Sequence, residues 1–374
     1  MLDFLYIDSQ KALDEMIAHY QTAAVLTIDT EFVRERTYHA ALGLIQIYDG
    51  EKLALIDPCC GLDLTGFWQL LVDESITKVL HSGSEDLEIF AHIGNCQPKP
   101  LFDSQFAAAL LGHGVAIGYA KLVEHYQSIE LDKGESRTDW LKRPLTQSQL
   151  NYAANDVYYL HSIYFELKQQ LVDQAKEQWV LAEGERATTD KLKSLDIEQA
   201  YTKVKNAFQL TPKQLAVLKP LAKWRLEQAL ERNLALGFIL KDHALIALAK
   251  KKPQNVNELI AMKELSEQEK RRHAKRIVKM IRDVDYQYLP EPIDVIAVRS
   301  WYKAAFKTCK SALNELAQEQ LLPVELLSSK KLVHGYLDWL HKGADEHSLP
   351  VLLQGWRGQV TAPTLKNLKL VLNS

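Results

Sequence analysis

The sequence predicts a mixed α/β domain followed by two small all-helical domains. Short apolar runs alternate with helical patterns over roughly the first 200 of the 374 residues, and strand patterns nearly vanish after residue 195. The charge changes sign at about the same place, because residues 1–200 hold 16 Lys and Arg against 31 Asp and Glu, whereas the rest hold 29 against 17. A chain of this length is too long for one ordinary core, so we expect domains at 1–200, 208–290 and 295–374.

Four short apolar segments predict the strands of the first domain. They are rich in Val, Ile and Leu and are bounded by Gly, Pro or Asp. They cover residues 23–32, 42–49, 52–58 and 76–82. Gly50 and Glu51 separate the two middle segments, so we expect a hairpin turn there.

Helical periodicity alternates with these strands and continues to the end of the chain. In the first domain it covers residues 63–73, 84–94, 104–112 and 120–127, and one long helix is expected over 146–178. Residues 130–145 are polar, so they predict a long loop, and long loops in compact domains are often functional. After residue 195 the predicted helices are separated by turns at Pro212, Pro220, Gly237 and Pro253.

The composition restricts the class of protein. With 47% hydrophobic and 25% charged residues the chain is typical of globular proteins. No apolar run approaches the ~20 residues that span a bilayer, and the acidic first residues lack the basic start of a signal peptide, so we expect no membrane association. No cysteine pair has CxxC spacing, so we expect free thiols, no zinc site and a cytoplasmic location; the cysteines are Cys59, Cys60, Cys96 and Cys309. The sequence does not fix the oligomeric state, and a monomer is the default expectation.

The opposite charges of the two parts of the chain suit a protein that cuts a polyanion. Carboxylates in one part can hold cations, while Lys and Arg in the other part hold phosphates. Ordinary variation of surface charge between domains is the alternative explanation. The asymmetry by itself therefore favours a nucleic-acid partner only modestly.

Four acidic residues and one tyrosine, in three separate stretches, are the main candidates for a functional site. Asp29 and Glu31 lie in VLTIDTEF, Asp86 lies in LHSGSEDLEIF, and Tyr152 and Asp156 lie in NYAANDV. Carboxylates beside apolar runs are costly to bury unless they are paired or bound to a cation. Converging oxygen ligands suit Mg²⁺ or Mn²⁺, and the associated chemistry is usually phosphoryl transfer to water.

The local geometry of each stretch is compatible with such a site. Asp29 and Glu31 are two apart in a predicted strand, so they share a face and repel unless protonated or bridged by cations. Asp86 is expected in the first turn of a serine-capped helix, where it could equally stabilise the positive end of the helix dipole. Tyr152 and Asp156 are four apart in a helix and therefore share a face. Each pattern alone also fits ordinary surface residues, whereas the ordered set favours a metal site.

The three stretches resemble a known family. In order and spacing, DTEF, HSGSEDL and YAANDV are similar to the three exonuclease motifs of the DEDD superfamily, tyrosine subclass. The loop LDKGESRTDWLKRPLT and two basic helical blocks extend the resemblance, over essentially the whole chain, to the bacterial ribonuclease D family. This resemblance implies a ribonuclease H-like exonuclease domain, then a helicase-and-RNase-D C-terminal (HRDC) domain and a second, degenerate HRDC copy. A weak likeness between residues 231–251 and 318–337 fits two such copies.

The resemblance also implies the chemistry of the site. Asp29, Glu31 and Asp156 would bind one divalent ion, Asp29 and Asp86 a second, and Tyr152 would position the attacking water. The implied activity is hydrolytic 3′-5′ exoribonuclease action with two Mg²⁺ or Mn²⁺ ions. It would release 5′-mononucleotides from the 3′ tails of tRNA precursors and other small structured RNAs. The alternatives are a helicase-associated type of DNA 3′-5′ exonuclease and an inactive nucleic-acid-binding module.

Five further residues are candidates for substrate binding. The resemblance implies that Thr30 and Phe32 meet the terminal nucleotide, although the alternation of the strand points Phe32 away from the metals. His81 could contact a phosphate or could be an internally hydrogen-bonded histidine. Lys223 and Arg225 belong to a predicted basic surface that also includes residues 250–252 and 270–276, whereas we expect the intervening tryptophan in a core.

Overall fold

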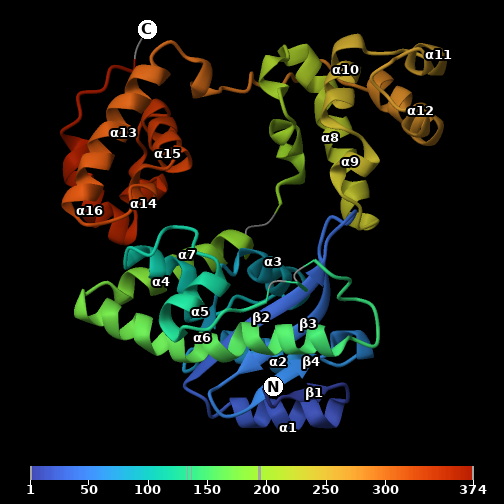
Figure 1. The fold of residues 1–374 in the computed structure, drawn as a ribbon. Coiled ribbons are helices and arrows are strands. Elements are labelled where there is room, and N and C mark those ends of the chain that lie inside the picture. The colour runs from blue at the N-terminus through green and yellow to red at the C-terminus, as the bar shows by residue number, and fades with distance from the viewer. Residues whose placement is uncertain (1, 133, 136, 193–194, 373–374) are drawn as a thin grey trace. The chain divides into compact units, whose positions relative to one another are not determined.

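The computed structural model describes residues 2–132, 134–135, 137–192 and 195–372, and the chain divides into two compact units. One unit comprises Met1–Val33, Ala41–Lys193 and Ile296–Ser374, and the other comprises Arg34–Ala40 and Ser194–Val295. The first unit contains an α/β domain and a C-terminal helical domain, and the second unit is helical (Figure 1). Within these described ranges, no helix combines the length and the apolar character needed to cross a membrane.

A six-stranded mixed sheet forms the centre of the α/β domain. Its strand order is β1-β4-β3-β2-β5-β6, in which β3 pairs antiparallel with β2 and β4 and the other neighbours are parallel. The sequence pattern predicts β2 to β5 but not the edge strands β1 and β6, because three residues are too few for a recognisable period. The strands are β1 (Leu5–Ile7), β2 (Val25–Val33), β3 (Ala41–Tyr48), β4 (Leu53–Ile56), β5 (Thr77–Leu80) and β6 (Leu101–Asp103).

The central strands are buried, and the turn between β3 and β4 is the expected hairpin. Gly50 in this turn has φ 97°, a left-handed conformation that favours glycine. Asp49 Oδ1 accepts hydrogen bonds from the backbone N–H groups of Glu51 and Lys52, which completes the turn. Both faces of β2 and β3 are covered, which explains why the sequence of these strands is almost continuously apolar. The side chains without exposed surface include Leu26, Ile28, Leu44, Ile45 and Ile47.

The helices of the α/β domain pack against this sheet, and α6 contacts β2, β3 and β4 (Figure 1). The helix expected over residues 146–178 is two helices, because α6 ends at Asp173 and Ala175 adopts a left-handed φ of 55° before α7 begins. The helices are α1 (Gln10–Tyr20), α2 (Thr65–Val72), α3 (Ser84–Ile93), α4 (Ser104–Leu110), α5 (Tyr119–Gln127), α6 (Gln147–Asp173) and α7 (Glu177–Leu192).

The predicted long loop lies before α6 and is anchored to the sheet by its second half. The Trp140 side chain is 1% exposed, and Arg143 donates hydrogen bonds to both carboxylate oxygens of Asp57 at 2.6 Å. Arg143 also donates to the backbone carbonyl of Gly43 in β3. Because the Trp140 ring lies 6.1 Å from the ring of Tyr152, this anchor supports one of the predicted site residues.

The C-terminal helical domain packs on α7 within the same unit. The ring of Trp356 in α16 stacks on Trp179 in α7, with centroids 4.8 Å apart and planes 13° apart. The neighbouring Arg357 is buried and forms an ion pair with Glu183 of α7. These contacts make one continuous core from α4, α5 and α6 into the C-terminal helices. The helices of this domain are α13 (Tyr302–Glu319), α14 (Glu325–Ser328), α15 (Lys330–His341) and α16 (Gly355–Lys366).

The second unit is a helical domain built around α8. The segment Arg34–Ala40, which follows β2 in sequence, belongs to this unit. Its Arg36 carbonyl accepts a hydrogen bond from the N–H of Ala235, and the His39 N–H donates to the Asn233 side chain. Helical periodicity therefore identifies most of this domain but not the segment contributed from residues 34–40. Its helices are α8 (Pro212–Glu231), α9 (Leu236–Ile239), α10 (Asp242–Lys251), α11 (Val256–Ile260) and α12 (Glu267–Arg282).

Candidate active site

Strand β2 presents Asp29 and Glu31 on the sheet face that α6 covers. The hydroxyl of Thr27 donates a hydrogen bond to the backbone carbonyl of Val157 in α6, which identifies this face. Side chains two residues apart in a strand point the same way, so positions 27, 29 and 31 all face α6. The predicted shared face of the two acids is therefore confirmed.

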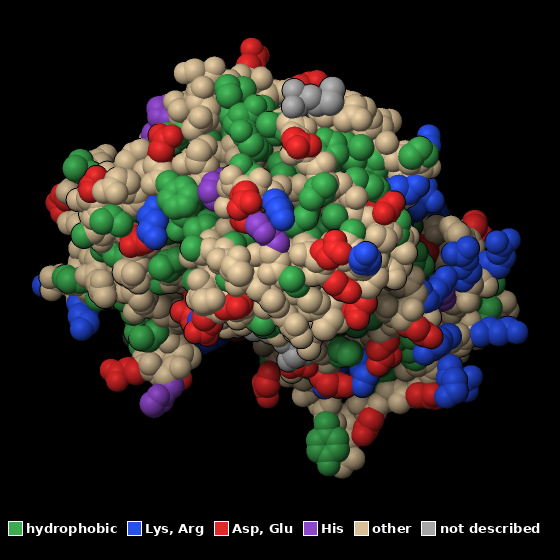
Figure 2. All heavy atoms as spheres, turned by 90° about the horizontal axis from the view of Figure 1, so that it is seen from below, with side chains coloured by type: hydrophobic (Ala, Val, Ile, Leu, Met, Phe, Trp, Pro, Cys, Tyr) green, Lys and Arg blue, Asp and Glu red, His purple; other side chains and the backbone are tan. Residues whose placement is uncertain are grey.

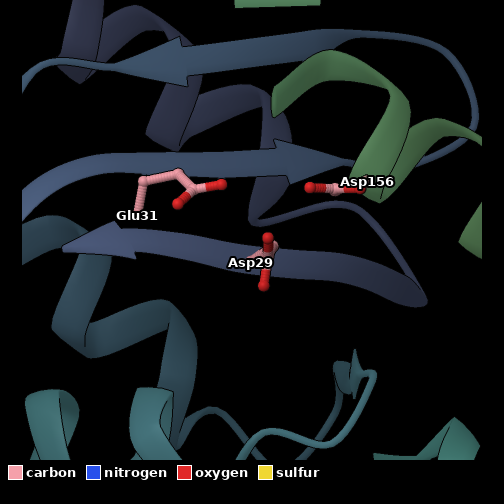
Figure 3. Close-up of side chains that lie close together, drawn as sticks. All are labelled: Asp29, Glu31 and Asp156. Carbon is pink, nitrogen blue, oxygen red and sulfur yellow. The ribbon is translucent and has the colours of Figure 1, made fainter. Parts of the chain in front are cut away.

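Three carboxylates meet between β2 and α6. Helix α6 begins with a capping box formed by Thr146 and Gln149, and its third turn carries Asp156. Asp29, Glu31 and Asp156 each offer a carboxylate oxygen, and these oxygens all lie within 4.8 Å of one another. Figure 3 shows the three carboxylates around a common space. Such a group of hard oxygen donors could hold a divalent cation.

Asp86 lies beside this cluster, in the first turn of α3. Its buried carboxylate accepts a hydrogen bond from the hydroxyl of Thr30, the residue between the two acids of β2. Asp86 is outside the group whose oxygens lie within 4.8 Å. It is nevertheless close enough for its charge to contribute to the raised pKa values of both Asp29 and Glu31.

The turn that leads into α3 is held by Asp103. The N-cap of α3 is Gly83 rather than the expected Ser84, which is the first residue of the helix. Asp103 Oδ1 accepts from the backbone N–H of Ser82, and Oδ2 accepts from that of Gly83, both at 3.2 Å. Asp103 also caps α4. The start of α3 is therefore positioned by the end of the neighbouring strand β6, which fixes where Asp86 stands.

Burial raises the pKa of each carboxyl group of the cluster, and mutual repulsion raises several of them further. The pKa of Glu31 rises to about 9, first through burial and then through the charges of Asp156 and Asp86. Burial raises the pKa of Asp156 to about 7 and that of Asp86 to about 6, although Asp86 accepts a hydrogen bond from the Thr30 hydroxyl. The pKa of Asp29 lies well above its usual range, because of burial and the other three acids. A bound cation would offset these costs.

A small cavity opens beside the cluster. Tyr152 and Asp156 lie one turn apart on α6 and both line this cavity, as their spacing predicts. Tyr119 also faces the cavity, and its hydroxyl donates to the backbone carbonyl of Asn155 at 2.7 Å. Tyr119 stands just before a predicted helix with no motif around it, so the sequence offers no signal for its place here. The cavity has a volume of about 160 Å³ and is lined by Ile28, Asp29, His81, Tyr119, Tyr152, Asp156 and Leu160.

The predicted nucleotide-binding residues near the cluster have different surroundings. His81 Nδ1 lies 2.9 Å from the Ser104 hydroxyl, and Nε2 donates to the backbone carbonyl of Ile117 at 3.1 Å. Both ring nitrogens thus have internal partners, which favours the internally bonded alternative over a phosphate contact. The hydroxyl of Thr30 donates a hydrogen bond to the carboxylate of Asp86 in α3. Phe32 is partly exposed and follows directly after a register shift in the β2–β3 pairing.

The two predicted substrate-binding residues of α8 are both engaged within the second unit. Arg225 is 5% exposed and donates hydrogen bonds to the Asp242 carboxylate at 2.6 Å and to the Leu240 carbonyl at 3.0 Å. The prediction that Arg225 contacts substrate is therefore wrong, because its guanidinium is buried where α8 meets the start of α10. Lys223 is partly exposed, and its ammonium forms an ion pair with Glu198.

Three family models match the chain in sequence order. A model described as 3′-5′ exonuclease matches residues 4–172, and the HRDC domain model matches residues 214–281. A model described as Ribonuclease D, C-terminal HRDC domain, matches residues 301–365. These ranges correspond to the α/β domain, the helical second unit and the C-terminal helices, respectively.

Known relatives cover nearly all of the chain. Ribonuclease D of Shewanella sp. (strain ANA-3) is 52% identical over 365 residues, covering 98% of this chain and 94% of that protein. Ribonuclease D of Escherichia coli (strain K12) is 38% identical over 373 residues, covering 98% of both. The crystal structure of Escherichia coli RNase D, described as an exoribonuclease involved in structured RNA processing, matches with a TM-score of 0.93 and covers 98% of both chains. The chain therefore belongs to the ribonuclease D family and is a 3′-5′ exoribonuclease, with an exonuclease domain followed by HRDC domains.

Proposed function

We propose that Asp29, Glu31, Asp86 and Asp156 hold two divalent cations, Mg²⁺ or Mn²⁺, at which a phosphodiester bond is hydrolysed. The observation that carries this proposal is the gathering of three carboxylate oxygens, from β2 and α6, within 4.8 Å. Among the described residues no Lys, Arg or His forms an ion pair with any of these carboxylates, so nothing in the described chain balances their charge. Bound cations supply the positive charge that the attacking and leaving oxygens require.

In this proposal the protein's own groups orient the ligands and the attacking water. Asp29 and Glu31 stand on a central strand, and the Thr30 hydroxyl holds the carboxylate of Asp86. The phenol of Tyr152 positions the water beside Asp156. Burial and the neighbouring acids raise the pKa of Tyr152, so its hydroxyl keeps its proton and stays a hydrogen-bond donor. Asp29, Glu31 and Asp156 would hold one ion, and Asp29 and Asp86 would hold the other.

The basic face of α12 is the surface that we propose for the RNA backbone. One side of this 16-residue helix is buried through Ala274, Ile277, Val278 and Ile281, so its basic residues lie on the uncovered side. Over about 24 Å, at 1.5 Å per residue, the helix offers phosphate partners in a row. Lys and Arg side chains gather at the right of Figure 2, the side on which Figure 1 draws α12. The exposed residues are Arg271, Arg272, Lys275, Arg276, Lys279 and Arg282.

The substrates that we propose are the single-stranded 3′ tails of tRNA precursors and of other small structured RNAs, shortened by one 5′-mononucleotide at a time. The structured-RNA processing named for the Escherichia coli relative supports this class. We further propose a monomer that works in the cytoplasm. The described cysteines are all free thiols, which suits a reducing compartment. Three domains, at 1–200, 208–290 and 295–374, complete the proposal.

Two active-site variants and one control test the proposed catalysis. Asp29→Asn and Asp156→Ala are expected to abolish release of nucleotides from a 3′-extended tRNA while RNA affinity persists. Glu85→Gln is the control, because Glu85 is an exposed acid that adjoins Asp86 in the first turn of α3. It is expected to digest at the wild-type rate. Full activity in both active-site variants would refute the assignment.

The products of digestion test the substrate and the need for metal. A 3′-extended tRNA is incubated with Mg²⁺, with Mn²⁺ or with a chelator, and the products are sized on a sequencing gel. We expect single-nucleotide steps that stop at the folded stem and no digestion with the chelator. A DNA oligonucleotide of matched sequence should be digested more slowly, and faster digestion of the DNA would reassign the substrate.

A charge reversal on α12 tests the RNA surface. Lys275→Glu should weaken RNA binding and reduce the slope of log affinity against log salt by about 0.7 per lost phosphate contact on a single strand. Lys11→Glu makes the same charge change at an exposed position of α1, and it should leave both the affinity and the slope unchanged. Equal effects of the two variants would show that net charge, and not the α12 face, governs binding.

A further inference from the structure

Gln46, at the centre of β3, is buried without a hydrogen-bond partner. Its side chain is 0% exposed, and neither Nε2 nor Oε1 bonds to any group in the described part of the chain. An unpaired buried polar group destabilises the folded state, because it gives up its hydrogen bonds to water without replacing them. A methionine of similar length would fill the position without that cost, so the carboxamide requires an explanation.

The strand register places Gln46 next to the carboxylate cluster. Gln46 is the residue directly opposite Asp29 in the antiparallel β2–β3 pairing. Directly opposite residues share a face, with Cβ atoms about 4.5–5.5 Å apart. The adjacent pair, Glu31 and Leu44, shows which face this is, because Leu44 packs in a core with Ala153 of α6. The Gln46 carboxamide is therefore enclosed beside Asp29, on the sheet face covered by α6, the helix that carries Asp156.

Asp29 has unused capacity to accept hydrogen bonds. The backbone N–H of Thr30 lies near enough to lower the pKa of this carboxylate, and a carboxylate offers about four acceptor positions in all. Carboxylates that ligate metals are normally oriented by a donor behind them. For Asp86 that donor is the Thr30 hydroxyl. Gln46 brings two unused N–H groups to the corresponding position at Asp29.

We propose that Gln46 is the positioning residue for Asp29, whose carboxylate it orients by donating a hydrogen bond from Nε2 when a divalent cation is bound. The inference rests on the proposed function, because it assumes that Asp29 is a metal ligand. Removing the donor leaves the carboxylate free to rotate about its side-chain bonds. The affinity for the cation should then fall by about 10–100-fold, which is the usual effect of losing such a donor.

The test is a titration of the full-length, chelator-treated protein with Mn²⁺ in a calorimeter, together with the Tm of the metal-free protein. Gln46→Met should bind Mn²⁺ about 10–100-fold more weakly. Its metal-free Tm should equal or exceed that of the wild type, because an unpaired carboxamide is removed from the core. In nucleotide release, kcat should fall at limiting Mn²⁺ and recover at saturation, with KM for RNA unchanged.

A matched control separates orientation from repacking. Leu55 in β4 is the buried residue opposite Gln46, and Leu55→Met is a similar change in the same core at a position that is not a predicted ligand. It should leave the Mn²⁺ affinity unchanged. Wild-type affinity in Gln46→Met would overturn the inference, and so would an equal loss in Leu55→Met. Gln46→Leu is judged by the same criteria if the Met variant does not fold. Failure of the wild type to bind Mn²⁺ would instead refute the proposed function.

Discussion

Replacing Arg143 with Met removes the cation that ties the loop before α6 to the sheet. Arg143 donates to both carboxylate oxygens of Asp57, to the Gly43 carbonyl in β3 and to the Trp140 carbonyl in its own loop. Met keeps most of the apolar stem and removes every one of these donors. The Asp57 side chain is 1% exposed, so the variant leaves a buried carboxylate that keeps only the hydrogen bonds from Tyr6 and from a backbone N–H.

The cost of this change can be worked from the pKa of Asp57. Burial alone would raise that pKa, but the hydrogen bonds from Arg143 and Tyr6 lower it from the ordinary 3.8 to about 2. This difference corresponds to about 2 kcal/mol of stability at neutral pH. Breaking a buried ion pair costs about 3–5 kcal/mol, and Arg143 is 24% exposed, so we expect about 3 kcal/mol. Because the folded pKa is depressed, the contribution is present above pH 3.8 and is lost as the pH falls through about 2.

Urea unfolding and hydrogen exchange measure the effect. Arg143→Met should unfold at a lower urea concentration and should lose exchange protection in residues 138–145. Because Trp140 packs near Tyr152, kcat should also fall, by about tenfold, while the KM for RNA changes little. Lys142→Met, at the exposed neighbouring position, should behave as the wild type. Stability of Arg143→Met within about 0.5 kcal/mol of the wild type would refute this reasoning.

Four further predictions concern the acid cluster and the packing around the sheet. Because the pKa values of Glu31 and Asp156 are raised to about 9 and about 7, Mn²⁺ binding at pH 7 should release protons, measured by calorimetry in two buffers of different ionisation enthalpy. Release of no protons would contradict the assignment of Glu31 and Asp156 as ligands. Because the raised pKa values make the folded protein bind more protons than the unfolded chain, the metal-free Tm should fall as the pH rises from about 6 to about 9. Lys78→Met should lower stability by about 3 kcal/mol in urea unfolding, because the buried ammonium donates to three backbone carbonyls that would lose their donor. Gly184→Ala should lower the Tm by several degrees, since a Cβ there would lie 2.2 Å from a carbonyl oxygen of β6, whereas Gly237→Ala has open space and should not.

The sequence by itself determined the face on which each acid stands. Alternation in VLTIDTEF puts Asp29 and Glu31 on one side of a strand, and four-residue spacing puts Tyr152 and Asp156 on one side of a helix. These are consequences of the backbone period, which is a local property, so they could be predicted without knowledge of the fold. The order of the motifs then identified the family, and with it the metal chemistry that we propose.

Only the tertiary structure decided which polar groups have partners. The sequence cannot distinguish Arg225, buried against Asp242, from the exposed cations of α12, because both lie in basic helical stretches. The same holds for the bond from Thr30 to Asp86 and for Gln46, whose place opposite Asp29 follows from strand register. Burial and pairing depend on residues that are distant in the chain, and a helix or strand period carries no information about them.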